Sequence, residues 1–156
     1  MKKEVEEEVK EPVVFKKKLL TSWTVGIYKG KNPFELKPIE GREYPFLGKK
    51  HVTDIPAWFL ADPFMIQVNG LWYMFIEIVQ LERRTGEIGL ATSENGVDWT
   101  YDRIVLKEHF HLSYPTVFEW EGDYYMVPET LGPEAIRLYK SKNFPYEWEH
   151  VTDLVE

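Results

Sequence analysis

Apolar residues along this chain gather in short runs separated by turn-forming residues, a pattern that predicts β-strands. The clearest example is Ala61–Ile78, where two runs rich in β-branched and aromatic residues flank Asn69-Gly70. An Asn-Gly pair supplies the two left-handed positions that a two-residue hairpin turn needs. The stretch therefore predicts a β-hairpin.

The turn also fixes the register of this hairpin. If Val68 faces Leu71, continued pairing places Asp62 opposite Glu77 at the open end of the ladder. Directly opposed side chains on one face lie about 4.5–5.5 Å apart at their Cβ atoms. The sequence therefore predicts two neighbouring carboxyl groups, which cannot both ionise freely.

The same pattern recurs later in the chain. Residues 113–130 align without a gap with the first hairpin, with Glu121-Gly122 as the turn and Tyr114 opposite Glu129. The segments that follow the two hairpins, residues 88–99 and 136–148, also correspond and both end in tryptophan. The sequence therefore predicts that each unit contains about four short strands and ends in a turn and a tryptophan.

A period of about fifty residues with four strands in each unit is typical of β-propeller blades. The strands are apolar on both faces, as in Trp72–Ile76, so they need cover on both sides. Packing of blade on blade provides that cover. We therefore predict an all-β fold of the β-propeller type with four-stranded antiparallel blades, against the alternative of repeated hairpins in a sandwich or barrel.

The repeat divides the chain into a tail and a partial propeller of about two and a half blades. An incomplete ring leaves apolar faces and strand edges uncovered. We therefore expect a homo-oligomer or a partner that supplies the missing blades. The predicted segments are a charged tail and lead-in strand (1–20), a half blade (21–35), a connection (36–60) and two blades (61–107 and 108–156).

Composition excludes several classes of protein. The net charge of −7 argues against nucleic-acid binding, which relies on clustered Lys and Arg. Cysteine is absent, which removes disulfides and thiolate metal sites and fits a reducing compartment. Met1 is followed by lysines and acids rather than an apolar segment, so we predict no signal peptide, and no apolar run is long enough for a membrane span. We expect a cytoplasmic protein.

Neither a metal nor a cofactor is expected. His109 and His111 alternate along a predicted strand, but no third ligand lies at a recognisable spacing. We therefore expect His111 to be hydrogen-bonded at the mouth of the propeller channel, where it is a candidate ligand-binding residue. No Gly-rich phosphate loop is present. Trp58 precedes the first hairpin and is a candidate platform for sugar stacking, with packing under a loop as the alternative.

Several strings together resemble a known superfamily: ADPF, EIGLATS, HLSYP and PET. They are similar to the five-bladed β-propellers of the arabinanase, β-xylosidase, invertase and levansucrase glycosidases. The likeness is greatest to the propeller module of glucosaminyl inositolphosphorylceramide transferases. It runs from about Trp23 to the C-terminus. The resemblance implies a five-bladed propeller fold and a carbohydrate ligand.

The resemblance also implies roles for individual residues. In the hydrolytic relatives, an Asp-Pro on the innermost strand of the first blade supplies the general base or nucleophile, and Asp62 matches it. The segment Ser113–Pro115 resembles a signature of the next blade. The other two catalytic carboxylates of those enzymes belong to later blades, beyond Glu156. We therefore expect a binding or accessory module rather than an independent catalyst.

Three functions remain open from the sequence. The first is a carbohydrate-binding or accessory module in which Asp62, Glu77, Glu129 and Tyr114 form hydrogen bonds with the ligand. The second is a structural module that oligomerises through its open blades. The third is a glycoside hydrolase with Asp62 as base or nucleophile and Glu77 as acid, with the glutamate pKa raised by its neighbour.

Overall fold

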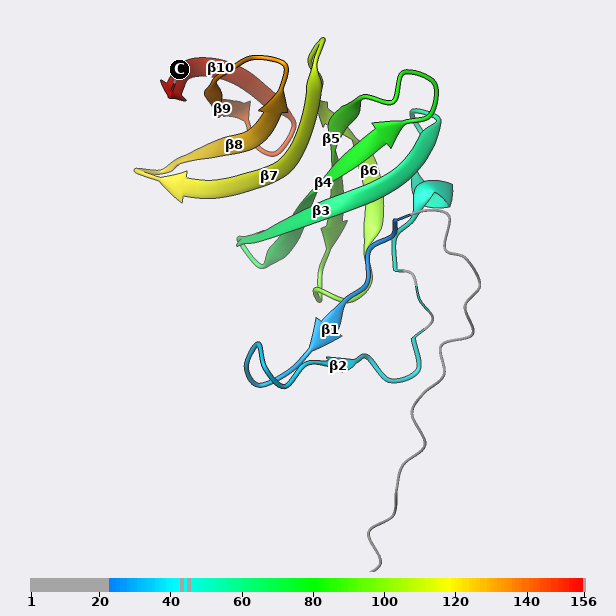
Figure 1. Ribbon diagram of the computed structural model, residues 1–156. Coiled ribbons are helices and arrows are strands. Elements are labelled where there is room, and N and C mark those ends of the chain that lie inside the picture. Colours follow the sequence, from blue (N-terminus) through cyan, green and yellow to red (C-terminus); the bar gives the residue numbers. More distant parts are fainter. Residues whose placement is uncertain (1–22, 43, 45, 156) are drawn as a thin grey trace, which may run out of the picture.

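The computed structural model describes residues 23–42, 44 and 46–155. Its regular structure consists of two four-stranded antiparallel sheets and one short hairpin (Figure 1). A single turn of 3-10 helix, η1 (Lys49–His51), precedes the first sheet. The all-β prediction with four-stranded antiparallel sheets is confirmed. The predicted tail and lead-in strand lie outside the described residues.

The first sheet has the order β3-β4-β5-β6. The turn between β3 and β4 is the predicted Asn69-Gly70 pair, whose φ angles are 50° and 85°. The first strand begins at Ala57, four residues inside the segment that the sequence assigned to a connection. The strands are β3 (Ala57–Val68), β4 (Leu71–Gln80), β5 (Gly86–Ser93) and β6 (Thr100–Leu106).

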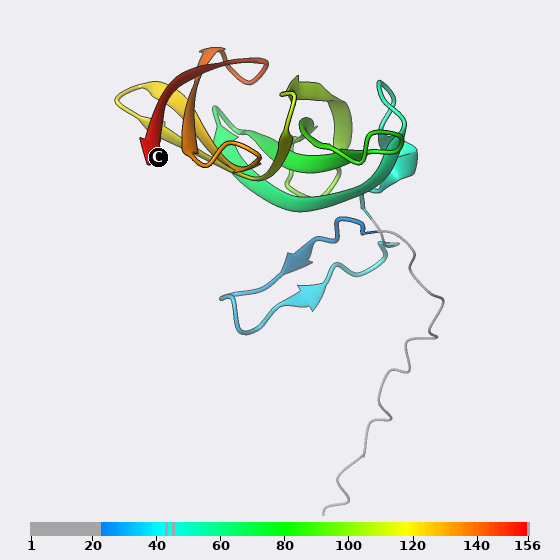
Figure 2. The same cartoon turned by 45° about the horizontal axis from the view of Figure 1, so that its top comes forward.

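The second sheet repeats this order with β7 on the inside and β10 at the outer edge. Its first turn, Glu121-Gly122, has φ angles of 51° and 84°, close to those of the first hairpin. The second sheet lies beside the first, and β7 is the strand that contacts β3, β4 and β5 (Figures 1 and 2). The strands are β7 (His111–Trp120), β8 (Asp123–Leu131), β9 (Ile136–Asn143) and β10 (Glu147–Val155).

The first sheet is covered on both faces, as its apolar strands require. One face, with Met74 and Ile76, packs against the preceding segment through Val25 and Leu47. The other face, with Phe75, packs against the second sheet. Full burial of such side chains is worth about 1.5–3 kcal/mol each. The buried members of the second cluster are Phe75, Ile88, Leu90, Leu106, Phe110, Leu112, Met126 and Tyr139.

The segment before β3 differs from the rest. Its strands β1 (Tyr28–Lys29) and β2 (Lys37–Pro38) pair with each other and form a small sheet of their own. Figure 2 shows this hairpin apart from the two larger sheets. The sequence predicted a half blade over residues 21–35. In the described part of the segment before β3, the β-structure consists of this short hairpin and an isolated bridge between Val25 and Leu47.

The predicted register is wrong by one residue at the open end of each hairpin. Glu77 pairs with Ala61 rather than with Asp62, and Glu129 pairs with Ser113 rather than with Tyr114. In each case two residues of the inner strand lie opposite one residue of its partner, which defines a β-bulge. The second residue of each bulge is proline, which has no N–H to donate to a ladder and is confined to edges and bulges.

Among the described residues, no helix is long and apolar enough to cross a bilayer.

Candidate functional site

The two bulges place Asp62 and Tyr114 at matching points of the two sheets. Their φ angles are 47° and 49°, in the left-handed region. That conformation is uncommon for residues other than glycine, and for a bulky residue it is strained. Bulges of this kind often redirect a side chain next to a functional site. The bulged ends of β3 and β7 therefore form the candidate site.

Glu77 is the buried acid of this site. Only 6% of this residue is exposed, which is unusual for a side chain that can carry a charge. Burial, followed by the charge of Asp62 and a hydrogen bond with Asp62, raises the pKa of Glu77 from 4.5 to about 7. The charge of Glu129 contributes in the same direction. The predicted carboxyl pair is therefore present, although the bulge and not a direct cross-strand pairing brings its members together.

His111 reaches this acid from the second sheet. Its Nε2 lies 2.9 Å from Oε1 of Glu77, and its Nδ1 accepts a hydrogen bond of 2.9 Å from the backbone N–H of Gly86. Both ring nitrogens are therefore engaged within the protein. Among the described residues, no group of three or more potential ligands is arranged to hold a metal ion.

A hollow of about 450 Å³ opens beside the carboxyl pair. This volume lies within the range of about 300–1,000 Å³ that is usual for small-molecule sites. Asp62 and Glu77 lie on one wall, and the aromatic rings of Trp23 and Phe59 contribute apolar surface. The remaining lining residues are Thr24, Leu60, Ala61 and Pro63.

The second sheet carries a matching hollow of about 350 Å³ that includes Tyr114 and Glu129. The Ser113 hydroxyl donates a hydrogen bond of 2.9 Å to Oε2 of Glu129. The Tyr114 ring contacts Phe64 of β3 edge to face, with 4.7 Å between ring centroids. The charge of Glu129 also acts on Glu77, so the two hollows lie close to each other. The sequence did not single out Ser113 as a partner of Glu129, because the bulge hides their pairing.

Trp58 lies outside this group. The guanidinium of Arg84 lies over its ring, with 3.5 Å between Cζ and the ring centroid. A cation on an aromatic face is a stable arrangement, and it covers that face of the ring. A sugar that stacked on the same face of Trp58 would have to displace Arg84.

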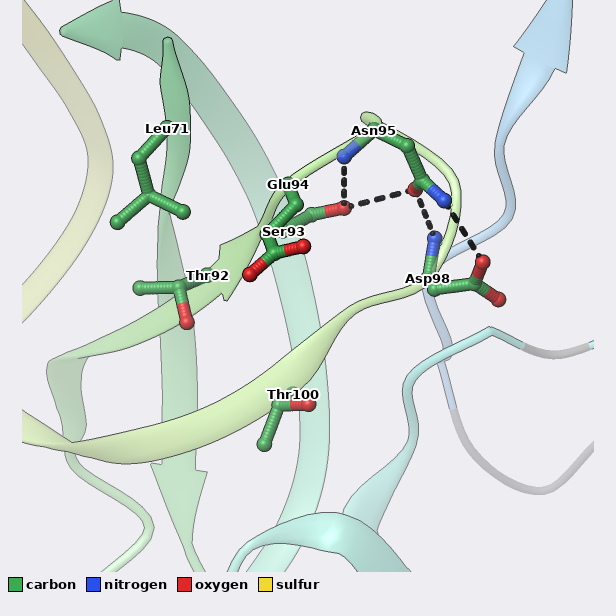
Figure 3. Close-up of a pocket in the computed structure, with 7 residues that line it drawn as sticks. All are labelled: Leu71, Thr92, Ser93, Glu94, Asn95, Asp98 and Thr100. Carbon is green, nitrogen blue, oxygen red and sulfur yellow. Dashed lines mark hydrogen bonds between the residues drawn. The ribbon is translucent and has the colours of Figure 1, made fainter. Parts of the chain in front are cut away.

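A third hollow, of about 400 Å³, lies at the turn between β5 and β6 (Figure 3). The side chains of Ser93 and Asn95 form hydrogen bonds within the turn. The Ser93 hydroxyl accepts a hydrogen bond of 3.0 Å from the Gly96 N–H, and Oδ1 of Asn95 accepts one of 2.8 Å from the Asp98 N–H. The indole of Trp99 donates to the Gly96 carbonyl oxygen. Ser93, Asn95 and Trp99 therefore serve to shape the turn.

The first sheet also buries a charged side chain that the sequence analysis missed. Glu87 is 1% exposed, and its Oε1 forms ion pairs with Arg83 and with Lys107, the latter at 3.1 Å. Its Oε2 has no hydrogen-bond partner among the described residues. Polar residues usually mark the exposed face of a strand, but β5 is buried on both faces, so the sequence pattern did not identify Glu87 as buried.

The relationship of the chain to known proteins follows from its sequence. Residues 16–155 match the family described as glucosamine inositolphosphorylceramide transferase 1, N-terminal. The chain belongs to this family. Proteins named Glucosamine inositolphosphorylceramide transferase 1 from Oryza sativa subsp. indica and from Arabidopsis thaliana are 38% and 36% identical to it. Each alignment covers 81% of this chain but only 19% of the relative. The chain therefore spans about a fifth of the length of these relatives.

Solved structures of two glycoside hydrolases share the fold of this chain. A family 32 β-fructofuranosidase of Bombyx mori matches with a TM-score of 0.58 and 17% identity, over 78% of this chain and 28% of that enzyme. A family 117 glycoside hydrolase of Zobellia galactanivorans matches with a TM-score of 0.53 and 19% identity, over 60% of this chain and 38% of that one. These matches confirm the β-propeller type of the fold, and the family match confirms the resemblance found in the sequence.

Proposed function

We propose that this chain is a carbohydrate-binding propeller module that serves a longer protein as an accessory part rather than as an independent catalyst. The family of the chain and the glycoside hydrolases that share its fold support a carbohydrate-related role. The observation that carries the proposal is the carboxyl pair Asp62 and Glu77 on the wall of an open hollow.

The hollow suits a sugar ring. Carboxyl oxygens accept hydrogen bonds from sugar hydroxyl groups, and a protonated carboxyl group donates one. The rings of Trp23 and Phe59 offer apolar surface to the C–H face of a sugar. Ligand sites combine such apolar walls with a few convergent polar groups. The adjacent hollow with Tyr114 and Glu129 extends the polar surface.

The same carboxyl pair favours binding over hydrolysis. Glycoside hydrolysis needs two carboxyl groups that flank the bond to be broken, about 5–5.5 Å apart for retention and about 6.5–9.5 Å for inversion. Glu77 and Asp62 instead line the same hollow, and Asp62 is close enough to raise the pKa of Glu77. Two neighbouring carboxyl groups of one hairpin lie on the same side of a bound ligand and do not flank the bond to be broken.

The names of the relatives contain glucosamine and inositol, and adding glucose gives a first panel of ligands. Glucosamine, glucose and myo-inositol can be titrated into the isotope-labelled chain while amide resonances are followed by NMR. We expect saturable binding of at least one sugar, with the largest shifts on the bulged ends of β3 and β7. Asp62→Asn should weaken that binding about tenfold or more, the size expected for hydrogen bonds to a charged group.

A matched control is Glu94→Gln, which alters a carboxyl group in the separate hollow of Figure 3. It should leave the affinity unchanged. The proposal is wrong if no sugar in the panel binds saturably, or if Asp62→Asn and Glu94→Gln bind as tightly as the wild type.

A second candidate function is an interaction module, and a specific surface supports it. Ile66 and Phe75 pack in the first sheet against the second sheet. In the second sheet, Met126 and Val117 pack toward the first sheet. Because side chains alternate along a strand, Phe118 and Val127, which follow Ile66 and Phe75 by 52 positions, lie on the opposite face, here called the open face. Phe118 and Trp120 on this face are 39% and 58% exposed. We propose that this face receives another sheet of the same kind, supplied by a second copy when the chain is alone.

A further inference from the structure

His111 connects three strands through one imidazole ring. It begins β7, accepts a hydrogen bond from Gly86 at the start of β5, and contacts Glu77 in β4, each at 2.9 Å. Gly86 allows this approach because it has no side chain. A Cβ at this position would lie 2.9 Å from Cε1 and 3.0 Å from Nε2 of the ring. The ring is therefore held on two sides.

These two contacts determine where the ring carries its proton. A backbone N–H can only donate, so Nδ1 of His111 must present a lone pair to Gly86. The proton of the neutral ring is then on Nε2, which donates to Oε1 of Glu77. A ring protonated on both nitrogens would direct one N–H against another. The contacts also leave neither ring nitrogen for a ligand, which favours a positioning role over the direct ligand contact expected from the sequence.

Glu77 is surrounded by groups that compete for protons. The groups that face it are Asp62 from β3, His111 from β7 and Glu129 from β8. Two neighbouring carboxyl groups do not both ionise freely, so the pair favours holding one proton. A donor fixed on Oε1 of Glu77 holds this carboxyl group in one orientation, and both Glu77 and Asp62 line the hollow.

We propose that His111 is a positioning residue for the carboxyl pair: through Nε2–H it orients Glu77 so that the pair offers one shared proton to an oxygen atom of a neutral sugar. This inference rests on the proposed sugar-binding function and adds a pH dependence to it. Binding of a neutral sugar should weaken as the pH rises through the range in which the shared proton is lost. The pKa of Glu77, raised to about 7 by burial and Asp62, puts that range near neutrality.

Two substitutions separate the two bonds of the ring. His111→Asn keeps an acceptor near the position of Nδ1 but loses the donor to Glu77. His111→Gln keeps a donor near the position of Nε2 but loses the acceptor for Gly86. Because a donated hydrogen bond stabilises the ionised carboxylate, its loss raises a carboxyl pKa. The pKa of Glu77 should rise by about one pH unit in His111→Asn and stay near the wild-type value in His111→Gln.

The experiment is an NMR titration of the full chain, with 13C-labelled glutamate and 15N-labelled histidine, from about pH 4 to about pH 9. In the wild type, the 15N spectrum should show a protonated Nε2 and an unprotonated Nδ1 on His111 near neutral pH. The midpoint of sugar binding against pH should move upward with the Glu77 pKa in His111→Asn alone.

Three results would overturn the proposal. They are the opposite tautomer in the wild type, an unchanged Glu77 pKa in His111→Asn, or an equal change in His111→Asn and His111→Gln. The 15N measurement on the wild type decides the point even if a variant does not fold. Because the tautomer and the Glu77 titration need no ligand, a failure to bind sugars would count against the proposed function and leave this test standing.

Discussion

His111 and Glu77 belong to different sheets, yet Nε2 of His111 lies 2.9 Å from Oε1 of Glu77. The contact means that the candidate site is built by the docking of two sheets and not by either hairpin alone. Leu112, the neighbour of His111, is fully buried in the cluster between the sheets. Packing of the sheets therefore fixes the position of the imidazole ring.

Glu77→Gln should stabilise the protein at high pH. The pKa of Glu77 rises from 4.5 to about 7 on folding, so its contribution favours the folded state below pH 4.5 and is lost as the pH rises through about 7. At about 1.4 kcal/mol for each pKa unit, the loss approaches about 3 kcal/mol. Glutamine resembles the protonated side chain and avoids this loss.

The check is the free energy of unfolding by urea at about pH 4 and about pH 8. The variant and the wild type should differ little at the lower pH, and the variant should be the more stable at the higher pH. A variant that is less stable than the wild type at about pH 8 contradicts the assignment. Glu82→Gln, an exposed change on a loop, is the control and should show no such pH dependence.

Most of the fold could be predicted from local pattern. The turn at Asn69-Gly70, the strands around it and the need for cover on both faces follow from residue types in a short window. The bulges at Asp62 and Tyr114 were not predicted, because counting residue pairs outward from the turn assumes that the ladder has no extra residue. Their signal was Pro63 and its counterpart Pro115, since a proline inside a strand indicates a bulge or an edge.

The candidate site was only partly predictable for a different reason. The proximity of Asp62 and Glu77 is local to one hairpin and was predicted. The bond from His111 to Glu77 depends on how the two sheets pack, and pairing rules within one sheet contain no information about that. The arginine over Trp58 likewise comes from a loop whose path is set by tertiary contacts.

Gly86→Ala should loosen the contact between the sheets. A Cβ at this position would lie 2.3 Å from the carbonyl oxygen of Leu112, which is backbone and cannot turn aside. Overpacking of this kind costs about 1–3 kcal/mol. We expect a lower urea midpoint together with loss of the His111 hydrogen bond in the 15N spectrum. Thr85→Ala, at the adjacent position, should leave both unchanged; a Gly86→Ala protein as stable as the wild type would show that the approach is not tight.

Asp54 should prove to be a structural anchor. Its two carboxylate oxygens accept hydrogen bonds of 2.7 Å, one from the Tyr101 hydroxyl and one from the Ile104 N–H. Burial, followed by the bond to Asp54, raises the pKa of Tyr101. Asp54→Ala leaves that buried hydroxyl without its acceptor, at a cost of about 1–3 kcal/mol.

A double-mutant cycle measures this anchor. Tyr101→Phe removes the hydroxyl, so adding Asp54→Ala to it should cost less than Asp54→Ala costs alone. Unfolding of the four proteins in urea gives the coupling free energy. Strict additivity of the two changes would mean that the hydrogen bond contributes nothing to stability.

Self-association should depend on the open face of the second sheet. Phe118 and Trp120 project from β7 onto this face, and the Phe118 ring stacks on Tyr125 with 5.8 Å between centroids. The corresponding face of the first sheet is buried against a neighbouring sheet, so the open face has the residue types of an interface. A second copy that docks on it would remove these rings from water, at roughly 25 cal/mol for each Å² of apolar surface buried.

Light scattering on a size-exclusion column tests this association. We expect the wild type to have a mass above that of one chain, and Phe118→Lys and Trp120→Lys each to shift it toward the monomer, because a charge in the contact must be desolvated on docking. Phe34→Lys is the matched control: Phe34 is 95% exposed on the separate β1–β2 hairpin, so its replacement should leave the mass unchanged. A wild type that is monomeric at all concentrations would rule out the second copy as the occupant of this face. Equal effects of Phe34→Lys and Trp120→Lys would place the contact elsewhere.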